Sequence, residues 1–231
     1  MAAKAMTKTE VEALTQKASL TLGKGTFGTV HLVRHSGEER ALKVGGPKAE
    51  VATLEKELRL MEHLAGAGGA PLALAFCADA PALLMSYRGR QDLLSWLTKK
   101  KTISERVCFR VALLVTEALE KVHAKGVVHC DFKTDNVVVE TNAKGVIRRV
   151  HIIDFGLALR EGGKQPPKGN GRLSWYCGCY YSEQPMTPAC DLVGLGVLFQ
   201  DLLQATEAGP KALHDMAARM QKRDHAKRPQ L

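Results

Sequence analysis

The sequence has no apolar run long enough to cross a lipid bilayer and no sign of an export signal. A membrane-spanning helix needs about 20 consecutive apolar residues, and no stretch of the 231 residues approaches that length. The first 17 residues are polar and contain no apolar segment of the signal-peptide type. We therefore expect an intracellular protein, in the cytoplasm, the nucleus or both, with no membrane partner.

Cysteine is scarce as well. Six cysteines are too few for a disulfide framework in a chain of this length. Cys177 and Cys179 form a Cys-x-Cys pair, but no second pair and no histidine pair follows at the spacing typical of zinc sites. We expect free, buried or half-buried thiols, which suit a reducing compartment.

The charge balance is basic, with a formal net charge of +9. A basic surface can indicate nucleic-acid binding. The lysines and arginines are spread along the chain, however, and only Lys99, Lys100 and Lys101 form a run. We expect a solvated basic surface with a mild attraction for acidic substrates, and no nucleic-acid partner. The sequence carries no signal for the oligomeric state.

Hydrophobic periodicity divides the chain into a β-rich part and a helical part. Alternation predicts three strands within residues 19–44 and two more near 72–76 and 81–87, with a helix over 48–64. Beyond residue 90 we predict helices over 93–97, 104–125, 191–205 and 210–222, and two short strands at 137–140 and 150–153. Ser104 is the expected N-cap of the long helix. This order predicts an α+β fold with a five-stranded antiparallel sheet and one helix, a mainly helical second part, and a cleft between the halves.

A glycine cluster, Gly23-Lys-Gly25-Thr-Phe27-Gly28, follows the first strand. A dinucleotide-binding fingerprint would need a helix after the glycines, whereas a second strand is predicted here. The glycines therefore lie in a hairpin turn whose backbone can close over phosphate groups.

Lys43 lies on the third predicted strand, beneath that turn. Alone, it would be read as a surface lysine on an edge strand. An acidic partner is expected on the following helix, from Glu50, Glu55 or Glu57. We choose Glu57 because apolar residues follow it at three, four and seven positions, which places it at the border of the buried helix face.

Two further motifs follow in order. His129-Cys-Asp131-Phe-Lys133-Thr-Asp-Asn136 comes after the long helix, and Asp154-Phe-Gly156 comes after the next strand. With the glycine turn and Lys43, this ordered set resembles the eukaryotic protein kinase superfamily from about residue 20 to residue 229. Compact, divergent kinases of this kind occur in large DNA viruses and in some divergent lineages.

The resemblance implies a bilobal kinase domain over residues 18–231. Its N-lobe would span residues 18–85, its hinge 86–89 and its C-lobe 90–231, after an N-terminal extension of residues 1–17.

The catalytic roles follow from the same resemblance. Asp131 would orient the substrate hydroxyl and accept its proton, and Lys133 would reach the γ-phosphate of ATP. Lys43 would hold the α- and β-phosphates and would itself be held by Glu57. Asn136 and Asp154 would ligate Mg²⁺, with Mn²⁺ as an alternative, because hard cations prefer oxygen donors.

The ATP site implied by the resemblance includes an apolar slot for adenine. Val30 and Ala41 would lie above the base and Val138 below it, although plain core packing explains these three residues equally well. Met85 would be the gatekeeper, Ser86 and Arg88 would bind the adenine edge through their backbone, and Asp92 would meet the ribose. The full ATP-binding set is Leu22, Gly23, Gly25, Phe27, Gly28, Val30, Ala41, Lys43, Met85, Ser86, Arg88, Asp92 and Val138.

The most favoured function is transfer of the γ-phosphoryl group of ATP to serine or threonine hydroxyls of proteins, since a lysine two residues after Asp131 resembles Ser/Thr kinases. A pseudokinase that binds nucleotide or acts as a scaffold is the alternative. Cys130 stands where the family has arginine, and Tyr181-Ser-Glu183 stands for the usual Ala-Pro-Glu. A small-molecule kinase is a third class.

Two structural roles are also implied. Asp191 would hold the backbone of the catalytic loop, and Arg228 would pair with Glu183. Cys130 lacks the charge with which the usual arginine binds a phosphorylated activation loop, so activity is expected not to need phosphorylation there.

Overall fold

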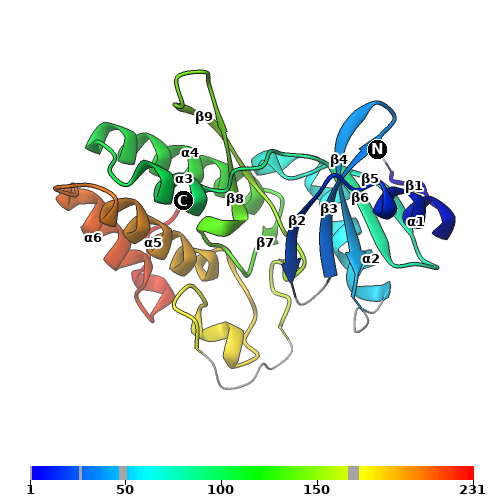
Figure 1. The fold of residues 1–231 in the computed structure, drawn as a ribbon. Helices are drawn as coiled ribbons and strands as arrows, with labels where there is room; N and C mark the ends of the chain where they lie inside the picture. Colours follow the sequence, from blue (N-terminus) through cyan, green and yellow to red (C-terminus); the bar gives the residue numbers. More distant parts are fainter. Residues whose placement is uncertain (1, 26–27, 47–50, 166–171) are drawn as a thin grey trace. The chain divides into compact units, whose positions relative to one another are not determined.

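The computed structural model describes residues 2–25, 28–46, 51–165 and 172–231. The chain divides into two compact units (Figure 1). The first consists of Met1–Gly66 and Ala70–Arg90, and the second of Ala67–Gly69 and Gln91–Leu231. The order of a sheet-rich unit followed by a mainly helical unit confirms the expected α+β class.

The first unit is built on a six-stranded sheet in the order β1-β5-β6-β4-β3-β2. Its strands are β1 (Lys4–Ala5), β2 (Leu20–Gly25), β3 (Gly28–His35), β4 (Glu38–Gly45), β5 (Ala73–Cys77) and β6 (Ala82–Ser86). β1 runs parallel to β5, and the other neighbours are antiparallel. The sheet thus has one strand more than the five expected, because a two-residue strand is too short to show alternation in the sequence.

Two helices accompany this sheet, α1 (Lys8–Gln16) and α2 (Val51–Leu64). α1 was not expected, but it begins at a capping box in which Thr7 Oγ1 accepts from the Glu10 amide and the Glu10 carboxylate accepts from the Thr7 amide. Val11 of α1 belongs to a buried cluster with Leu42 and Leu84 of the sheet. The segment before residue 18 is therefore part of the core of the first unit.

Four helices form most of the second unit: α3 (Leu93–Lys100), α4 (Glu105–His123), α5 (Pro188–Gln204) and α6 (Lys211–Met220). Ser104 caps α4, as expected, because its Oγ accepts from the Val107 amide at 3.4 Å. α5 is buried along most of its length and packs against α4 and α6 (Figure 1). It is the central helix of this unit.

Short strands and 3-10 turns frame the loops of the second unit. β7 (Val127–Val128) pairs with β10 (Leu159–Arg160), and β8 (Val137–Thr141) pairs with β9 (Ile147–Ile152). The 3-10 turns are η1 (Ala67–Gly69), η2 (Thr134–Asn136), η3 (Gly178–Tyr181) and η4 (His225–Lys227). The loop between β7 and β8 carries residues 129–136, and β9 leads directly to Asp154.

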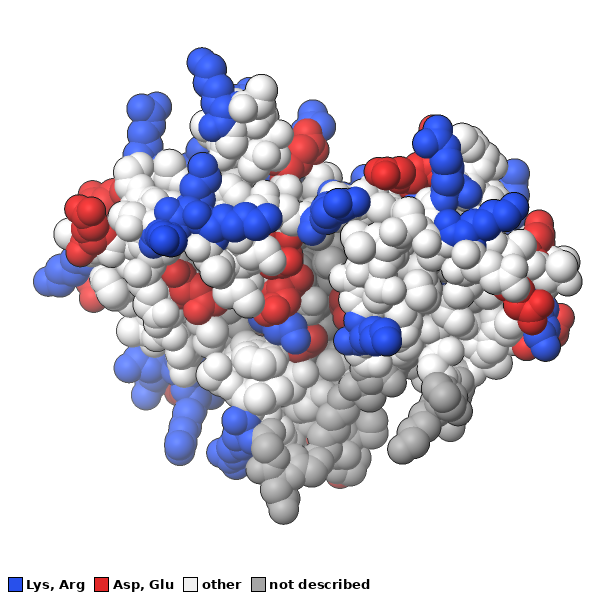
Figure 2. Space-filling model, viewed as in Figure 1, with Lys and Arg blue, Asp and Glu red and all other residues white. Residues whose placement is uncertain are grey.

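Basic side chains are dispersed over the face shown in Figure 2, with Asp and Glu side chains scattered among them. Among the described residues, none of the helices has the length and apolar character needed to span a membrane.

Candidate functional site

A buried ion pair joins β4 to α2 in the first unit. Lys43 Nζ on β4 is 2.7 Å from Glu57 Oε2 and 3.0 Å from Glu57 Oε1 on α2. Only 5% of Lys43 and 2% of Glu57 is exposed. Buried charges are tolerated when they are paired in this way. The pairing inferred from helical spacing is the pairing found here, and it leaves a fixed cation on β4.

The glycine turn joins β2 to β3, so a strand follows the glycines as expected and the strand-to-helix turn of a dinucleotide-binding fold is excluded. Gly28 has φ 142°, and a Cβ at this position would lie 2.1 Å from the Val44 carbonyl oxygen. Any side chain here would push β3 away from β4. Phe27, which the sequence assigned to ATP binding, lies outside the described residues.

The register of the sheet gathers several predicted nucleotide-binding residues on one face. Val30 of β3 is directly opposite Lys43, and Ala41 is directly opposite Met85 of β6. Cross-strand partners point to the same face, and residues two apart on a strand do so as well. Val30, Ala41, Lys43 and Met85 therefore share the face on which Glu57 approaches. The opposite face carries Leu42 and packs against α1.

The last residue of β6 and the residues that follow it are already engaged in local contacts. The Ser86 amide donates to the Leu72 carbonyl at 2.9 Å, and Ser86 Oγ accepts from the Leu72 amide at 2.8 Å. Arg88 Nη2 donates to the Ala70 carbonyl at 2.6 Å, and burial lowers the pKa of this guanidinium. These bonds fix the segment predicted to be the hinge, and they occupy the Ser86 amide.

In the second unit, Asp131 is the centre of a hydrogen-bonded cluster. Asp131 Oδ2 accepts from Asn136 Nδ2 at 3.1 Å and lies 3.3 Å from Lys133 Nζ. Asn136 Nδ2 also donates to the Asp131 carbonyl at 2.8 Å. Asp131 Oδ1 accepts from Trp175 Nε1 at 2.8 Å. An ionised carboxylate offers about four acceptor directions, and these three contacts fix the orientation of Asp131.

Trp175 and Tyr176 also lie against Asp131, and the sequence analysis did not predict either of them for the site. Besides the bond to Asp131, the Trp175 ring centroid lies 5.0 Å from Lys133 Nζ, within cation–π range. Burial and the neighbouring Asp131 carboxylate raise the pKa of Tyr176. The available signal was two adjacent aromatic residues just after a stretch rich in Gly, Pro and Lys.

His129 ties the segment of Asp131 to the segment of Asp154. Its Nδ1 accepts from the Asp131 amide at 3.3 Å, so the proton lies on Nε2, which donates to the Ile153 carbonyl at 3.0 Å. The Ile153 amide in turn donates to the Asn136 carbonyl at 2.9 Å. The segments that carry Asn136 and Asp154 are therefore joined, and their side-chain oxygens are the kind of donor that suits Mg²⁺.

Asp154 itself has φ 61°, a left-handed conformation that is uncommon for a residue with a side chain. Its Oδ1 accepts from the Gly156 amide at 3.4 Å.

The central helix α5 contacts the loop of residues 129–136, between β7 and β8, through Asp191. Asp191 Oδ2 accepts from the His129 amide at 2.7 Å, and Oδ1 accepts from the Cys130 amide at 2.8 Å. His123 Nε2 of α4 lies 2.9 Å from Oδ2. The predicted role of Asp191 in holding the loop backbone is confirmed.

The same face of α5 makes two further contacts with the loop. A Cβ at Gly194 would lie 2.0 Å from the Phe132 carbonyl oxygen, so only glycine permits this approach. Asp201 Oδ2 accepts from Thr134 Oγ1 at 3.2 Å, and burial raises the pKa of Asp201. The helix thus supports the loop at three points along its length.

Asp92, the predicted ribose contact, is the N-cap of α3. Its Oδ1 accepts from the Ser95 amide and its Oδ2 from Ser95 Oγ, both at 2.7 Å. It also forms an isolated β-bridge with Val138, which is buried. A contact with ribose remains a prediction.

The expected pair between Glu183 and Arg228 is wrong. Arg228 is buried, and its Nη1 donates to the Ala189 carbonyl at 2.6 Å and to Cys177 Sγ at 3.3 Å. Its Nε donates to the Lys222 carbonyl at 2.7 Å. Glu183 is exposed and has φ 53°, in the turn after η3. The left-handed turn leaves the carboxylate in solvent, where it needs no buried cation.

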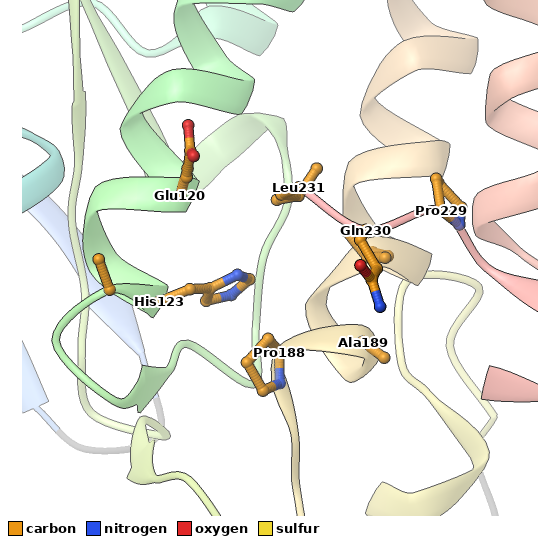
Figure 3. Close-up of a pocket in the computed structure, with 9 residues that line it drawn as sticks. Glu120, His123, Pro188, Ala189, Pro229, Gln230 and Leu231 are labelled. Carbon is orange, nitrogen blue, oxygen red and sulfur yellow. The ribbon is translucent and has the colours of Figure 1, made fainter. Parts of the chain in front are cut away.

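One pocket of about 440 Å³ lies within the second unit, apart from this site (Figure 3). Its walls come from the end of α4, the start of α5 and the last three residues of the chain. His123 lines it and contacts Asp191, which holds the loop of residues 129–136.

Comparison with known protein families shows to which family this chain belongs. The sequence model of the protein kinase domain matches residues 17–229. The chain belongs to the protein kinase domain family. The bilobal kinase class expected from the ordered motifs is thereby confirmed.

One curated relative is Serine/threonine/tyrosine-protein kinase HT1 of Arabidopsis thaliana. It is 26% identical over 181 residues, which are 76% of this chain and 43% of that protein. The kinase-domain chain described here therefore spans less than half the length of this relative.

Proposed function

We propose that this chain is a protein kinase that transfers the γ-phosphoryl group of ATP to serine or threonine hydroxyls of protein substrates, inside the cell and with Mg²⁺. The observation that carries the proposal is the Asp131 cluster. Its carboxylate is oriented by Asn136, Lys133 and Trp175, which prepares it to accept the hydrogen bond of a hydroxyl group.

At the nucleotide end, Lys43 is suited to bind the α- and β-phosphates because Glu57 fixes its position and both are buried. The amine needs no large reorganisation when phosphate arrives, which is the kind of preorganisation that phosphoryl transfer requires. Val30, Ala41 and Met85 share its sheet face and would contact the adenine.

At the acceptor end, Asp131 would receive the hydrogen bond of the substrate hydroxyl and take its proton as the phosphoryl group is transferred. Lys133 would neutralise charge on the γ-phosphate oxygens. Asn136 and Asp154 would hold Mg²⁺, which when bound supplies charge neutralisation to the phosphates. The proposal requires the two units to bring Lys43 and Asp154 to the same nucleotide.

Cys130 supports activity that does not depend on phosphorylation of the activation loop. Its thiol is buried and donates to the Val128 carbonyl at 3.5 Å. A buried neutral thiol cannot pair with a phosphate as a guanidinium does. Phosphatase treatment of the purified protein should leave its rate unchanged.

The decisive experiment measures transfer of radiolabel from Mg-ATP to a generic basic protein. Asp154→Ala should lower the rate by several orders of magnitude, because metal neutralisation contributes several kcal/mol to the transition state. Asp135→Asn is the matched control, since Asp135 is an exposed acid on the same loop. Equal labelling by the wild type and Asp154→Ala would refute the proposal.

Acceptor identity is tested on the same labelled product by phosphoamino-acid analysis. We expect phosphoserine and phosphothreonine. The relative is named as a kinase for all three acceptor residues, so tyrosine is included in the test. Phosphotyrosine as the main product would refute the Ser/Thr assignment while leaving kinase activity intact.

A nucleotide-binding pseudokinase is the second candidate, and one observation favours it. Trp175 already occupies one acceptor direction of Asp131 Oδ1, so a substrate hydroxyl must approach beside the indole. If Mg-ATP raises the melting temperature but no acceptor is labelled at any substrate concentration, this candidate is the correct one.

A further inference from the structure

Four side chains with metal-binding chemistry meet in the second unit, outside the site described above. Cys177, Cys179, Cys190 and His225 place their ligand atoms within 4.8 Å of one another. His225 Nε2 lies 3.1 Å from Cys177 Sγ and 3.4 Å from Cys179 Sγ. Cys177 and Cys190 are buried, and the other two are partly buried. They come from three segments: the start of η3, the start of α5 and η4.

We propose that these four residues bind one Zn²⁺ ion in a closed, structural Cys3His site. Zinc takes four tetrahedral ligands, with Zn–S near 2.3 Å and Zn–N near 2.0–2.1 Å, so neighbouring ligand atoms lie about 3.6–3.8 Å apart. The two sulfur–nitrogen distances are within half an ångström of this, and all four ligand atoms lie within 4.8 Å of one another, so small side-chain shifts would close the shell around an ion. Four ligands also complete the shell, which is typical of structural sites.

Other chemistry accounts for this cluster less well. Thiols are weak hydrogen-bond donors and weak acceptors. Three of them around one imidazole nitrogen therefore form only weak hydrogen bonds with one another and with the ring. A disulfide would consume two cysteines and leave the third beside the histidine. Zinc uses all four, and its binding releases the thiol protons to solvent.

Arg228 supplies a second, independent observation. Its guanidinium is buried, yet among the described residues none of the groups to which it donates is a carboxylate. Three thiolates, one neutral imidazole and Zn²⁺ carry a net charge of −1. Arg228 Nη1, 3.3 Å from Cys177 Sγ, would neutralise that charge. The site therefore gives this buried cation the counter-charge that Glu183 does not provide.

A backbone amide donates a hydrogen bond to one of the proposed zinc ligands. The Thr187 amide lies 3.4 Å from Cys190 Sγ and points its proton at the sulfur. Hydrogen bonds of this kind orient metal-binding thiolates and stabilise their negative charge.

The position of the site gives the zinc a structural role near the catalytic loop. Cys177 directly follows Trp175 and Tyr176, and the Tyr176 ring stacks on Tyr180 with centroids 4.1 Å apart. Zinc would join this segment to α5 and to the chain near its last residues. The proposed ion thus fixes the segment whose Trp175 contacts Asp131, although its presence does not depend on the proposed kinase activity.

The first test is the metal content of the whole chain, purified without a histidine tag under reducing conditions. We expect about one zinc per chain by mass spectrometry of the acid-released metal. Asp154→Ala should bind the same amount, so a failure of the proposed catalysis and a failure of the zinc site are distinguishable.

The ligand set is tested with matched variants. Cys190→Ala should lower bound zinc by about tenfold or more, since it removes one of four ligands. Cys108→Ala is the control, because Cys108 is an equally buried helical cysteine of the same unit, outside the cluster. If Cys190→Ala does not fold, Cys179→Ala and His225→Ala replace it, since both residues are partly exposed.

Replacing the zinc by Co²⁺ gives a visible absorption spectrum that reports on the metal ligands. A variant that only disturbs packing would not change this spectrum. A tetrahedral cobalt site with thiolate ligands should show strong visible absorption and a sulfur-to-metal charge-transfer band, and the latter should weaken in Cys179→Ala. Chelation should lower the melting temperature of the wild type but not that of folded His225→Ala.

Three outcomes would overturn the proposal. One is a purified chain with negligible zinc that neither takes up added Zn²⁺ nor changes its melting temperature with it. Another is equal zinc in the wild type and in all three ligand variants. The third is a disulfide among Cys177, Cys179 and Cys190 in protein kept under reducing conditions.

Discussion

In the first unit, the buried carboxylate of Glu57 is held by a cation, because both of its oxygens face Lys43 Nζ. In the second unit, the equally buried carboxylate of Asp191 is held by two backbone amides and His123. A side-chain cation can be exchanged for an apolar residue, whereas a backbone amide cannot be removed. The first arrangement is therefore replaceable as a pair, and the second is fixed by the path of the catalytic loop.

Asp191→Asn should have the largest effect on stability. Both oxygens of Asp191 accept hydrogen bonds, so an NH2 group in place of either oxygen sets a donor against a donor. Losing charge-assisted bonds to buried amides should cost about 3–5 kcal/mol of the free energy of unfolding. Urea denaturation measures this cost. A cost below about 1 kcal/mol would show that the amides find other partners.

Glu57→Gln should cost less, about 1.5–3 kcal/mol, because the amide oxygen can still accept from Lys43 while the charge is lost. The sharper test is the double variant Lys43→Met with Glu57→Leu. Its free energy of unfolding should differ from that of the wild type by no more than about 1 kcal/mol. Activity should be lost in the double variant. A double variant as unstable as Glu57→Leu alone would contradict the view that the pair is replaceable.

Gly194→Ala tests the close approach between α5 and the loop of residues 129–136 while leaving the hydrogen bonds of Asp191 in place. A methyl group here meets the Phe132 carbonyl at 2.0 Å, and overpacking of this kind costs about 1–3 kcal/mol. Gly196→Ala is the matched control on the same helix, since its nearest neighbours lie at 3.0 Å and include a flexible Gln221 side chain. Equal melting temperatures for the two variants would remove the steric argument.

Asp201→Asn should have the smallest effect on the free energy of unfolding, and it should raise this free energy at pH 7 where the other variants lower it. Burial raises the pKa of Asp201, which the hydroxyl of Thr134 only partly offsets. Between the ordinary pKa of an aspartate, about 3.9, and this raised value, the folded state binds more protons than the unfolded state. Stability from this group is therefore present at low pH and is lost as pH rises through that window.

The variant lacks this titration, and its amide oxygen can still accept from Thr134. Asp201→Asn should gain stability over the wild type at pH 7 and lose that advantage toward pH 4. Denaturation curves at the two pH values decide the matter, and a gain that grows on acidification would contradict the raised pKa.

Much of the fold was predictable because hydrophobic spacing is a local property. The helices that became α4 and α5, the Ser104 cap and the choice of Glu57 all rest on residues three or four apart. β1 and α1 were missed, because two-residue strands and a helix with a single buried residue leave little periodic signal.

The prediction that Cys177 and Cys179 have no metal-binding partner shows what motif spacing along the chain cannot reveal. Cys177 and Cys179 were judged without a partner because Cys190 and His225 are remote in the sequence, and only the packing of η3 and η4 against α5 brings them together. The pair expected between Glu183 and Arg228 failed for the same reason, since a family pattern cannot show which acceptors surround a buried guanidinium.

The sequence by itself determined the order of motifs, the α+β class and the place of Lys133 and Asn136 close to Asp131, because each depends on short-range patterns along the chain. Only the tertiary structure decided that Trp175 orients Asp131, that α5 supports the catalytic loop at three points, and that four metal-binding side chains converge. These contacts join residues that are distant in the chain, and their energies depend on burial and direction, which arise only once the chain has folded.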